Sequence, residues 1–212
     1  MFLRKERGFE RVALLGFSKG SEYALSYSSR FPDNGIDAIV AISPSTYIWQ
    51  GINRNIDVKS SWSLNGEPLS FIPWQYNADV ITMLRSRGPK EFRKLYQYSL
   101  KNTSATQLAQ ASLNLTNSDA KVLLIAGTDD GSWPAAKMAE RLYSQLQTGG
   151  RSNRVEQHIF QDAGHLIYFD YLPVTDSRAQ SGQVFGGTIE ANINARRKSW
   201  KAVEVFLKSQ LN

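Results

Sequence analysis

Residues that could carry covalent catalysis follow an apolar run near the start of the chain. The stretch RVALLGFSKGSEYAL, residues 11–25, sets a Gly-x-Ser-x-Gly pattern between a strand-like and a helix-like segment. A sharp turn between a strand and a helix strains the serine backbone and projects its hydroxyl beyond the sheet, which favours Ser18 as a nucleophile. We expect Gly16 and Gly20 to supply the room for this turn. The alternative is a glycine-rich turn that only packs well.

A serine hydroxyl is a poor nucleophile at neutral pH and needs a base, and the sequence contains only two histidines. His158 lies inside the predicted strand VEQHIF, where an ordinary strand side chain is expected. His165 follows an Ala-Gly pair in a loop just beyond that strand. We therefore predict that His165 is the base; the alternative is a loop histidine without a role.

The base must be oriented by an acid, and the stretch LLIAGTDDGSW places Asp129 and Asp130 directly after another apolar run. In strand-turn-helix architectures of this kind the acid commonly lies three residues after the glycine that ends the strand. Counting from Gly127 selects Asp130, with Asp129 capping the next helix or facing water. Asp129 stays the alternative acid. The chain order serine, aspartate, histidine is that of the α/β-hydrolase triad.

Alternating strand and helix patterns would position these residues. Short apolar runs predict strands at 11–16, 36–42, 121–126 and 154–160, and helical spacing predicts helices at 18–30, 133–146 and about 191–211. This alternation predicts an α/β fold with a mostly parallel sheet covered by helices on both faces.

Two stretches interrupt the alternation. Residues 47–119 begin polar and Trp-rich and read as helical through 91–113, while residues 166–190 are rich in Gly, Ser and aromatics. Long insertions of this kind are usually lids or binding loops. We expect a single domain over residues 1–212, with residues 44–119 as a lid or insertion within it.

Composition narrows the function classes. The chain has 212 residues, of which 42% are hydrophobic and 21% charged, as in an ordinary soluble domain, and its apolar runs are too short for a membrane helix. The absence of cysteine excludes a disulfide scaffold, a cysteine-based zinc site and a thiol nucleophile. The charge of +6 comes from scattered basic residues, so we do not expect nucleic-acid binding. The chemistry calls for no cofactor or metal. The opening MFLRKERGFE is too polar for a secretory signal, which predicts a cytoplasmic location.

Four stretches together carry a resemblance to a known family: LLGFSKGSEYALSYSS, LLIAGTDDGSWPA, FQDAGHLI and VFGGTIEANINARRKSWKAVEVFL. They resemble the α/β-hydrolase domain shared by acyl-CoA thioesterases and bile acid-CoA:amino acid N-acyltransferase, the BAAT C-terminal domain. The resemblance implies that Ser18, Asp130 and His165 are nucleophile, acid and base. It also implies that the backbone N–H of Lys19 lies in the oxyanion hole. The Gly-Gly at 186–187, followed by a helix with an inward Trp200, resembles the family's closing segment.

The resemblance also implies a substrate. Serine is typical of the hydrolytic branch and cysteine favours the transferase branch, so a serine in a chain without cysteine predicts hydrolysis of acyl-CoA thioesters. The positive net charge suits the phosphates of coenzyme A, although the sequence assigns no particular Lys or Arg to them. A carboxylesterase or dienelactone-hydrolase-like enzyme acting on an acyl ester is the alternative.

Only about ten residues precede the first predicted strand, whereas several strands precede the elbow in the full fold. The sequence therefore predicts a hydrolase that lacks its N-terminal strands and the loop that gives the second oxyanion N–H. An exposed edge on the strand at 11–16 could pair with another chain, giving self-association. A second hypothesis is thus a truncated, weakly active or inactive fragment that acts by association.

Overall fold

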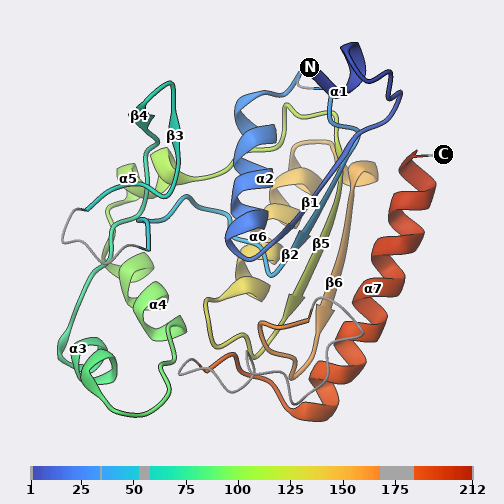
Figure 1. The fold of residues 1–212 in the computed structure, drawn as a ribbon. Helices are drawn as coiled ribbons and strands as arrows, with labels where there is room; N and C mark the ends of the chain where they lie inside the picture. Colours follow the sequence, from blue (N-terminus) through green and yellow to red (C-terminus); the bar gives the residue numbers. More distant parts are fainter. Residues whose placement is uncertain (1, 34, 53–57, 168–183, 212) are drawn as a thin grey trace.

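The computed structural model describes residues 2–33, 35–52, 58–167 and 184–211. At its centre is a parallel four-stranded sheet in the order β1-β2-β5-β6 (Figure 1). Its strands are β1 (Ala13–Phe17), β2 (Ala38–Ile42), β5 (Lys121–Gly127) and β6 (Val155–Phe160).

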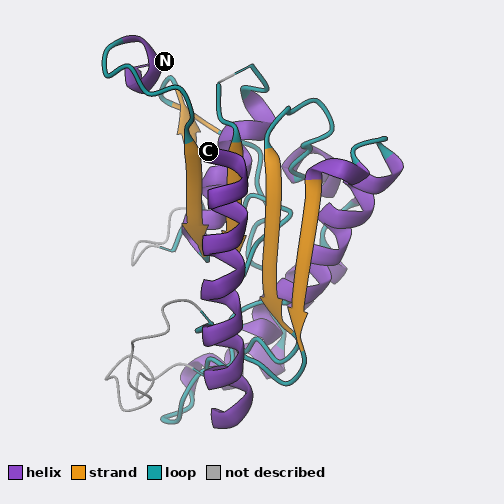
Figure 2. Ribbon diagram, turned by 90° about the vertical axis from the view of Figure 1, so that its right-hand side faces the viewer, coloured by secondary structure: helices purple, strands orange, loops and turns teal. Residues whose placement is uncertain are grey.

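Helices cover both faces of this sheet. Figure 1 shows α2 and α6 on one face and α7 on the other, and Figure 2 shows α7 crossing in front of the strands. The predicted α/β class, with a parallel sheet between helices, is confirmed. The helices are α1 (Phe2–Lys5), α2 (Lys19–Arg30), α3 (Ala78–Arg85), α4 (Arg93–Asn102), α5 (Ala105–Ala111), α6 (Ala135–Thr148) and α7 (Ile189–Leu211), with a short 3₁₀ turn at Ser152–Arg154.

The two faces of the central strands build two cores, because side chains alternate along a strand. On β5, Val122 and Leu124 pack into the core that includes α2 and α6, whereas Leu123 and Ile125 pack into the core beneath α7. All five residues of β2 are buried. Both faces of the central strands are therefore apolar, which explains why their sequences are continuous apolar runs.

Residues 44–119 connect β2 to β5 and contain several elements that lie outside the central sheet. They include α3, α4, α5 and a small hairpin of β3 (Ser63–Leu64) and β4 (Glu67–Pro68), drawn on the left of Figure 1. Their first residues are not peripheral, because Ile48 and Trp49 are fully buried in the core that contains α2 and α6. Whether this insertion acts as a lid stays a prediction.

The prediction of one long helical segment over residues 91–113 is wrong. The structure has two helices there, α4 and α5, with Thr103 in extended backbone between them. The Ser104 side chain accepts a hydrogen bond from the N–H of Gln107 at 3.2 Å and so starts a new helix. Of the loop expected over 166–190, residues 168–183 lie outside the described part of the chain.

One edge of the described sheet is formed by β1, which pairs with β2 alone among the described strands. Leu15 on this strand is 48% exposed, unlike the residues of β2. Self-association through this edge stays a prediction.

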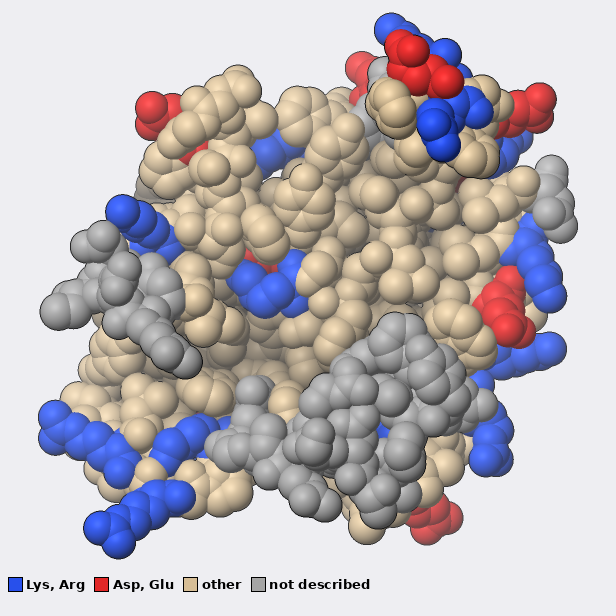
Figure 3. Space-filling model, in the orientation of Figure 1, with Lys and Arg blue, Asp and Glu red and all other residues tan. Residues whose placement is uncertain are grey.

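Within the described residues, no helix is both long and apolar enough to cross a membrane. In Figure 3, Lys and Arg side chains lie along the lower left of the molecule, where Figure 1 draws α3, and much of that face is uncharged.

Candidate active site

The parallel sheet brings the candidate residues together, since the carboxyl ends of all four strands lie on the same side of the sheet. Ser18 follows β1, Asp130 lies three residues after the end of β5, and His165 lies five residues after the end of β6. The His165 Nε2 atom is 2.8 Å from Ser18 Oγ, and its Nδ1 atom is 2.7 Å from Asp130 Oδ2. The imidazole thus links the hydroxyl to the carboxylate, although the residues come from three distant parts of the sequence.

Ser18 is held in a strained turn between β1 and α2. Its φ of 53° is positive, and its own N–H donates to Ile42 O at 2.9 Å as a continuation of the strand pairing. A Cβ on Gly16 would collide with the carbonyl of Gly20, so a side chain at position 16 is excluded. The expectation for Gly20 is wrong, because a Cβ built there meets no described atom within 4 Å apart from the neighbouring backbone of α2. The backbone of residue 20 approaches residue 16, so position 16 must lack a side chain. A side chain at position 20 would meet no such obstacle.

The two candidate aspartates make different contacts, and only Asp130 contacts His165 within the described part of the chain. Asp130 is 1% exposed, and its Oδ1 atom accepts the N–H groups of Ser132 and Trp133 at 2.8 and 3.1 Å, which leaves Oδ2 for His165. Asp129 points elsewhere. Its carboxylate pairs with Arg93 at 3.0 Å and accepts the N–H of Gly187 at 2.9 Å, so it neither caps α6 nor is simply solvated.

The loop that carries His165 is fixed by the segment just before α7. The His165 N–H donates to Phe185 O at 2.8 Å, and the Phe185 ring lies parallel to the imidazole with centroids 6.1 Å apart. Gly186 and Gly187 have φ of +76° and +77°, and a Cβ on either would collide with backbone of the acid loop or the histidine loop. Asn192 on α7 accepts the Gly164 N–H at 2.7 Å. The Gly-Gly segment therefore holds the acid and histidine loops together.

Ser43 is a supporting residue that sequence reasoning missed. It follows β2, is fully buried and has a positive φ of 48°. Its hydroxyl donates to the His165 carbonyl at 3.0 Å, and its own carbonyl accepts Trp133 Nε1 at 3.2 Å. The Ser-Pro-Ser that ends the strand was a signal of a turn, but nothing local connected it with a histidine 122 residues away.

Glu22 was also missed, one helical turn after the serine. This fully buried carboxylate receives two hydrogen bonds from Lys19 Nζ, both at 2.7 Å, and one from Trp62 Nε1 at 2.9 Å. Lys19 Nζ also donates to Ser61 Oγ at 2.7 Å. Burial raises the pKa of Glu22 and lowers the pKa of Lys19, in each case against the attraction of the partner charge. The pair ties the first turn of α2 to the insertion.

The remaining expectations concern Lys19, His158 and metals. The backbone N–H of Lys19 opens α2 and donates to no acceptor within the described part of the chain, as an oxyanion donor requires. His158 is an exposed strand residue whose ring lies near Phe160, with centroids 6.4 Å apart. No cluster of metal-ligating side chains occurs among the described residues.

A serine hydroxyl within hydrogen-bond reach of an imidazole that is in turn oriented by a buried carboxylate is an arrangement for nucleophilic acyl transfer. The imidazole can accept the hydroxyl proton at Nε2, while the carboxylate fixes the proton at Nδ1 and stabilises the imidazolium that forms. The parallel sheet, the strained turn after β1 and the order of these residues define an α/β-hydrolase-type domain.

Comparison with known proteins then gives the family. The family described as BAAT / Acyl-CoA thioester hydrolase C terminal matches residues 1–212, and the chain belongs to it. The chain is 26% identical to human Acyl-coenzyme A thioesterase 1 over an alignment of 216 residues. The alignment covers 94% of this chain and 44% of that protein. It is also 26% identical to mouse Acyl-coenzyme A amino acid N-acyltransferase 1 over 153 residues, covering 66% of this chain and 35% of that protein. The chain thus spans less than half the length of these relatives.

Among solved structures, the chain is similar to the esterase RhEst1 from Rhodococcus sp. ECU1013, with a TM-score of 0.45 and 15% identity over 98% of this chain and 69% of that one. It is also similar to a PHB depolymerase from Penicillium funiculosum, with a TM-score of 0.42 and 14% identity over 79% of this chain and 43% of that one.

Proposed function

We propose that this chain hydrolyses acyl thioesters, with acyl-CoA as the substrate and Ser18, His165 and Asp130 as nucleophile, base and acid. The observation that carries the proposal is the continuous hydrogen-bond chain from Ser18 Oγ through both imidazole nitrogens to Asp130 Oδ2. Membership of a family described by acyl-CoA thioester hydrolysis supports the substrate class.

The first half of the reaction transfers the acyl group to the serine. Ser18 Oγ attacks the acyl carbonyl carbon while His165 Nε2 accepts the hydroxyl proton, and Asp130 stabilises the resulting imidazolium. The N–H of Lys19 donates to the developing oxyanion. The carbon–sulfur bond then breaks, the thiol leaves with the proton from His165, and an acyl-serine ester remains.

Water completes the cycle by the reverse route. His165 accepts a proton from a water molecule, the hydroxide attacks the acyl-serine carbonyl, and the proton passes to Ser18 Oγ as the carboxylic acid leaves. The same imidazole acts in both halves, since it is free of the proton at Nε2 at the start of each. A serine ester is hydrolysed readily by this route, and the chain has no cysteine that could form a thioester intermediate for transfer to an amine.

Residues 44–119 are proposed to act as the lid of this site. In support, Trp49 and Trp62 of the insertion contact the Glu22 carboxylate on α2, close to the nucleophile turn. Trp133 connects the same insertion to the base, since its ring lies 5.3 Å from Tyr96 on α4 and 5.8 Å from His165.

The substrate class is tested by comparing kcat/KM for an acyl-CoA with that for the p-nitrophenyl ester of the same acyl group. A thioesterase is expected to prefer acyl-CoA, because binding energy from the nucleotide can be used at the reacting centre. Preference for the activated ester, whose leaving group is better, contradicts the thioesterase proposal and supports the esterase alternative. Turnover of neither supports the alternative of a weakly active fragment.

A further inference from the structure

A groove outside the triad lies between α4, α5 and α6. Its volume is about 410 Å³. Apolar groups make up most of its wall, and they come from the residues that follow β2 as well as from the three helices: Tyr47, Leu100, Leu108, Pro134 and Met138. Tyr47 and Met138 are buried, so the groove has a fixed apolar floor.

Three cations surround this floor. Lys101 extends from α4, and Lys137 and Arg141 lie one turn apart on α6; all three are exposed. No carboxylate is among the described residues that line the groove, and none of the three cations forms an ion pair within the described part of the chain. The groove is therefore a site where positive charge converges without being neutralised.

Two features of the floor are suited to a polar, planar ligand: an arginine over an aromatic ring and a buried hydroxyl without a partner among the described residues. The Arg141 guanidinium carbon lies 5.3 Å from the centroid of the Tyr47 ring, which orients this cation over an aromatic face. Thr46 lines the same groove, and its buried Oγ1 atom has no hydrogen-bond partner among the described residues. A buried hydroxyl without a partner is uncommon and marks a place where a partner is missing.

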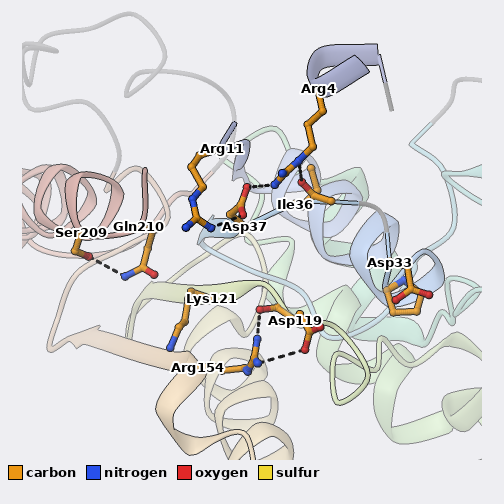
Figure 4. Close-up of a pocket in the computed structure, with 12 residues that line it drawn as sticks. Arg4, Arg11, Asp33, Ile36, Asp37, Asp119, Lys121, Arg154, Ser209 and Gln210 are labelled. Carbon is orange, nitrogen blue, oxygen red and sulfur yellow. Dashed lines mark hydrogen bonds and ion pairs between the residues drawn. The ribbon is translucent and has the colours of Figure 1, made fainter. Parts of the chain in front are cut away.

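A larger cavity, of about 610 Å³, differs in its charge balance (Figure 4). It lies at the opposite end of the sheet, where Asp37 precedes β2 and Lys121 begins β5. Its arginines are already paired: Arg4 and Arg11 bind Asp37 at 2.5 and 3.0 Å, and Arg154 binds Asp119 at 3.3 Å. That cavity is an ion-pair network far from the chemistry, whereas the groove carries unpaired cations.

The groove is close to the base. Pro134 in its wall directly follows Trp133, whose ring centroid is 5.8 Å from that of His165. Met138 in its floor contacts Ser45 Oγ at 3.4 Å, and Ser45 lies two residues beyond Ser43, which holds the His165 carbonyl. The wall and the floor of the groove thus each lie within a few residues of side chains that contact His165.

We propose that this groove binds the phosphorylated nucleotide end of the coenzyme A thioester, with Lys101, Lys137 and Arg141 contacting its phosphates. Several cations on two helices match a ligand with several phosphates, whereas a fatty acid would present one carboxylate. The apolar floor beside Tyr47 accepts the planar base. The inference rests on the proposed thioesterase function and adds where the leaving group is held.

The test measures binding of adenosine 3′,5′-bisphosphate by calorimetry to the full chain and to two double variants. Lys101→Gln/Lys137→Gln removes two groove cations. Lys198→Gln/Lys201→Gln removes the same charge from exposed positions on α7, which covers the opposite face of the sheet. We expect the groove variant to lose at least about tenfold in affinity and the α7 variant less than about twofold, because general attraction acts on both alike.

Hydrolysis separates this inference from the function on which it rests. The groove variant is expected to raise KM for acyl-CoA with little change in kcat, and to leave hydrolysis of the matching N-acetylcysteamine thioester, which has no phosphates, unchanged. Absence of bisphosphate binding, equal losses in the two variants, or displacement of the bisphosphate by a fatty acid would overturn the groove assignment. If the bisphosphate binds in the groove but no thioester is hydrolysed, the proposed function fails and the nucleotide site stands.

Discussion

Asp130→Asn is predicted to abolish base function by reversing the tautomer of His165. Asparagine keeps the shape of the side chain and can keep its oxygen on the N–H groups of Ser132 and Trp133. Its amide nitrogen then faces His165 Nδ1 and donates to it, so the imidazole proton must lie on Nε2. That nitrogen is 2.8 Å from Ser18 Oγ and can no longer accept the hydroxyl proton.

The structure also says why the amide would not simply flip. In the flipped orientation the NH₂ group would face two backbone N–H donors and leave both without an acceptor. A buried unsatisfied donor costs about 1–3 kcal/mol, so two such donors outweigh the single bond gained to the imidazole. The tautomer error costs on the order of 10⁴ in kcat in a serine protease triad, which is about 5 kcal/mol, and we expect a loss of that order here.

Asp129→Asn is the matched control, since it makes the same chemical change one residue away. The Asp129 side chain is 50% exposed and pairs with Arg93, a contact worth about 0–1 kcal/mol at an exposed site. We expect kcat to fall by no more than about fivefold. Release of coenzyme A can be followed with a thiol-reactive dye, because the chain contains no cysteine. Equal losses in the two variants, with both folded by circular dichroism, would refute the reasoning.

Three further predictions concern stability, measured as the free energy of unfolding in urea. Gly16→Ala is expected to prevent folding or cost several kcal/mol because its Cβ collides with backbone, whereas Gly20→Ala should gain about 0.5 kcal/mol; similar results for both would contradict the turn geometry. Glu22→Gln is expected to lower the free energy of unfolding by about 3 kcal/mol, because it leaves the Lys19 ammonium without its charged partner. Adding Lys19→Met should recover much of that loss. If it recovers none, the loss does not come from the unpaired lysine. At Asp37, burial raises the pKa, but the Val12 N–H and two arginines outweigh it and lower the pKa below its usual 3.8. Its contribution is therefore present above about pH 4 and lost below, so Asp37→Asn should destabilise at pH 7 and have little effect near pH 2; a constant difference would contradict this.

The sheet and the candidate nucleophile could be predicted because their signals are local. The runs around Leu15 and Leu123 have strand length and strand composition, and the Gly-x-Ser-x-Gly pattern lies between a strand and a helix. The division between α4 and α5 was not predicted, although Ser104 and Gln107 have the spacing of a capping box.

Other features depend on contacts between distant residues. We expected both glycines of the Gly-x-Ser-x-Gly motif to be needed for space. The path of the α2 backbone crowds position 16 and leaves position 20 open, which the motif alone does not show. Ser43 follows a different strand from His165 and donates to the His165 carbonyl, and the Glu22 carboxylate accepts hydrogen bonds from Lys19 and from a tryptophan 40 residues away. The groove likewise combines α4 with α6, which are separated by more than thirty residues. No local pattern encodes these pairings, so they required the folded structure.

The central claim, that Ser18 is an activated nucleophile, is tested most directly by covalent labelling. The chain is incubated with a fluorophosphonate probe, which reacts with activated serines, and the labelled peptide is identified by mass spectrometry. We predict a single label on Ser18 that is lost in Ser18→Ala, with little change in the thermal midpoint because the substitution removes only a partly buried hydroxyl that contacts His165. Equal labelling of the Ser18→Ala variant, or a label on another serine of the folded chain, would contradict the account.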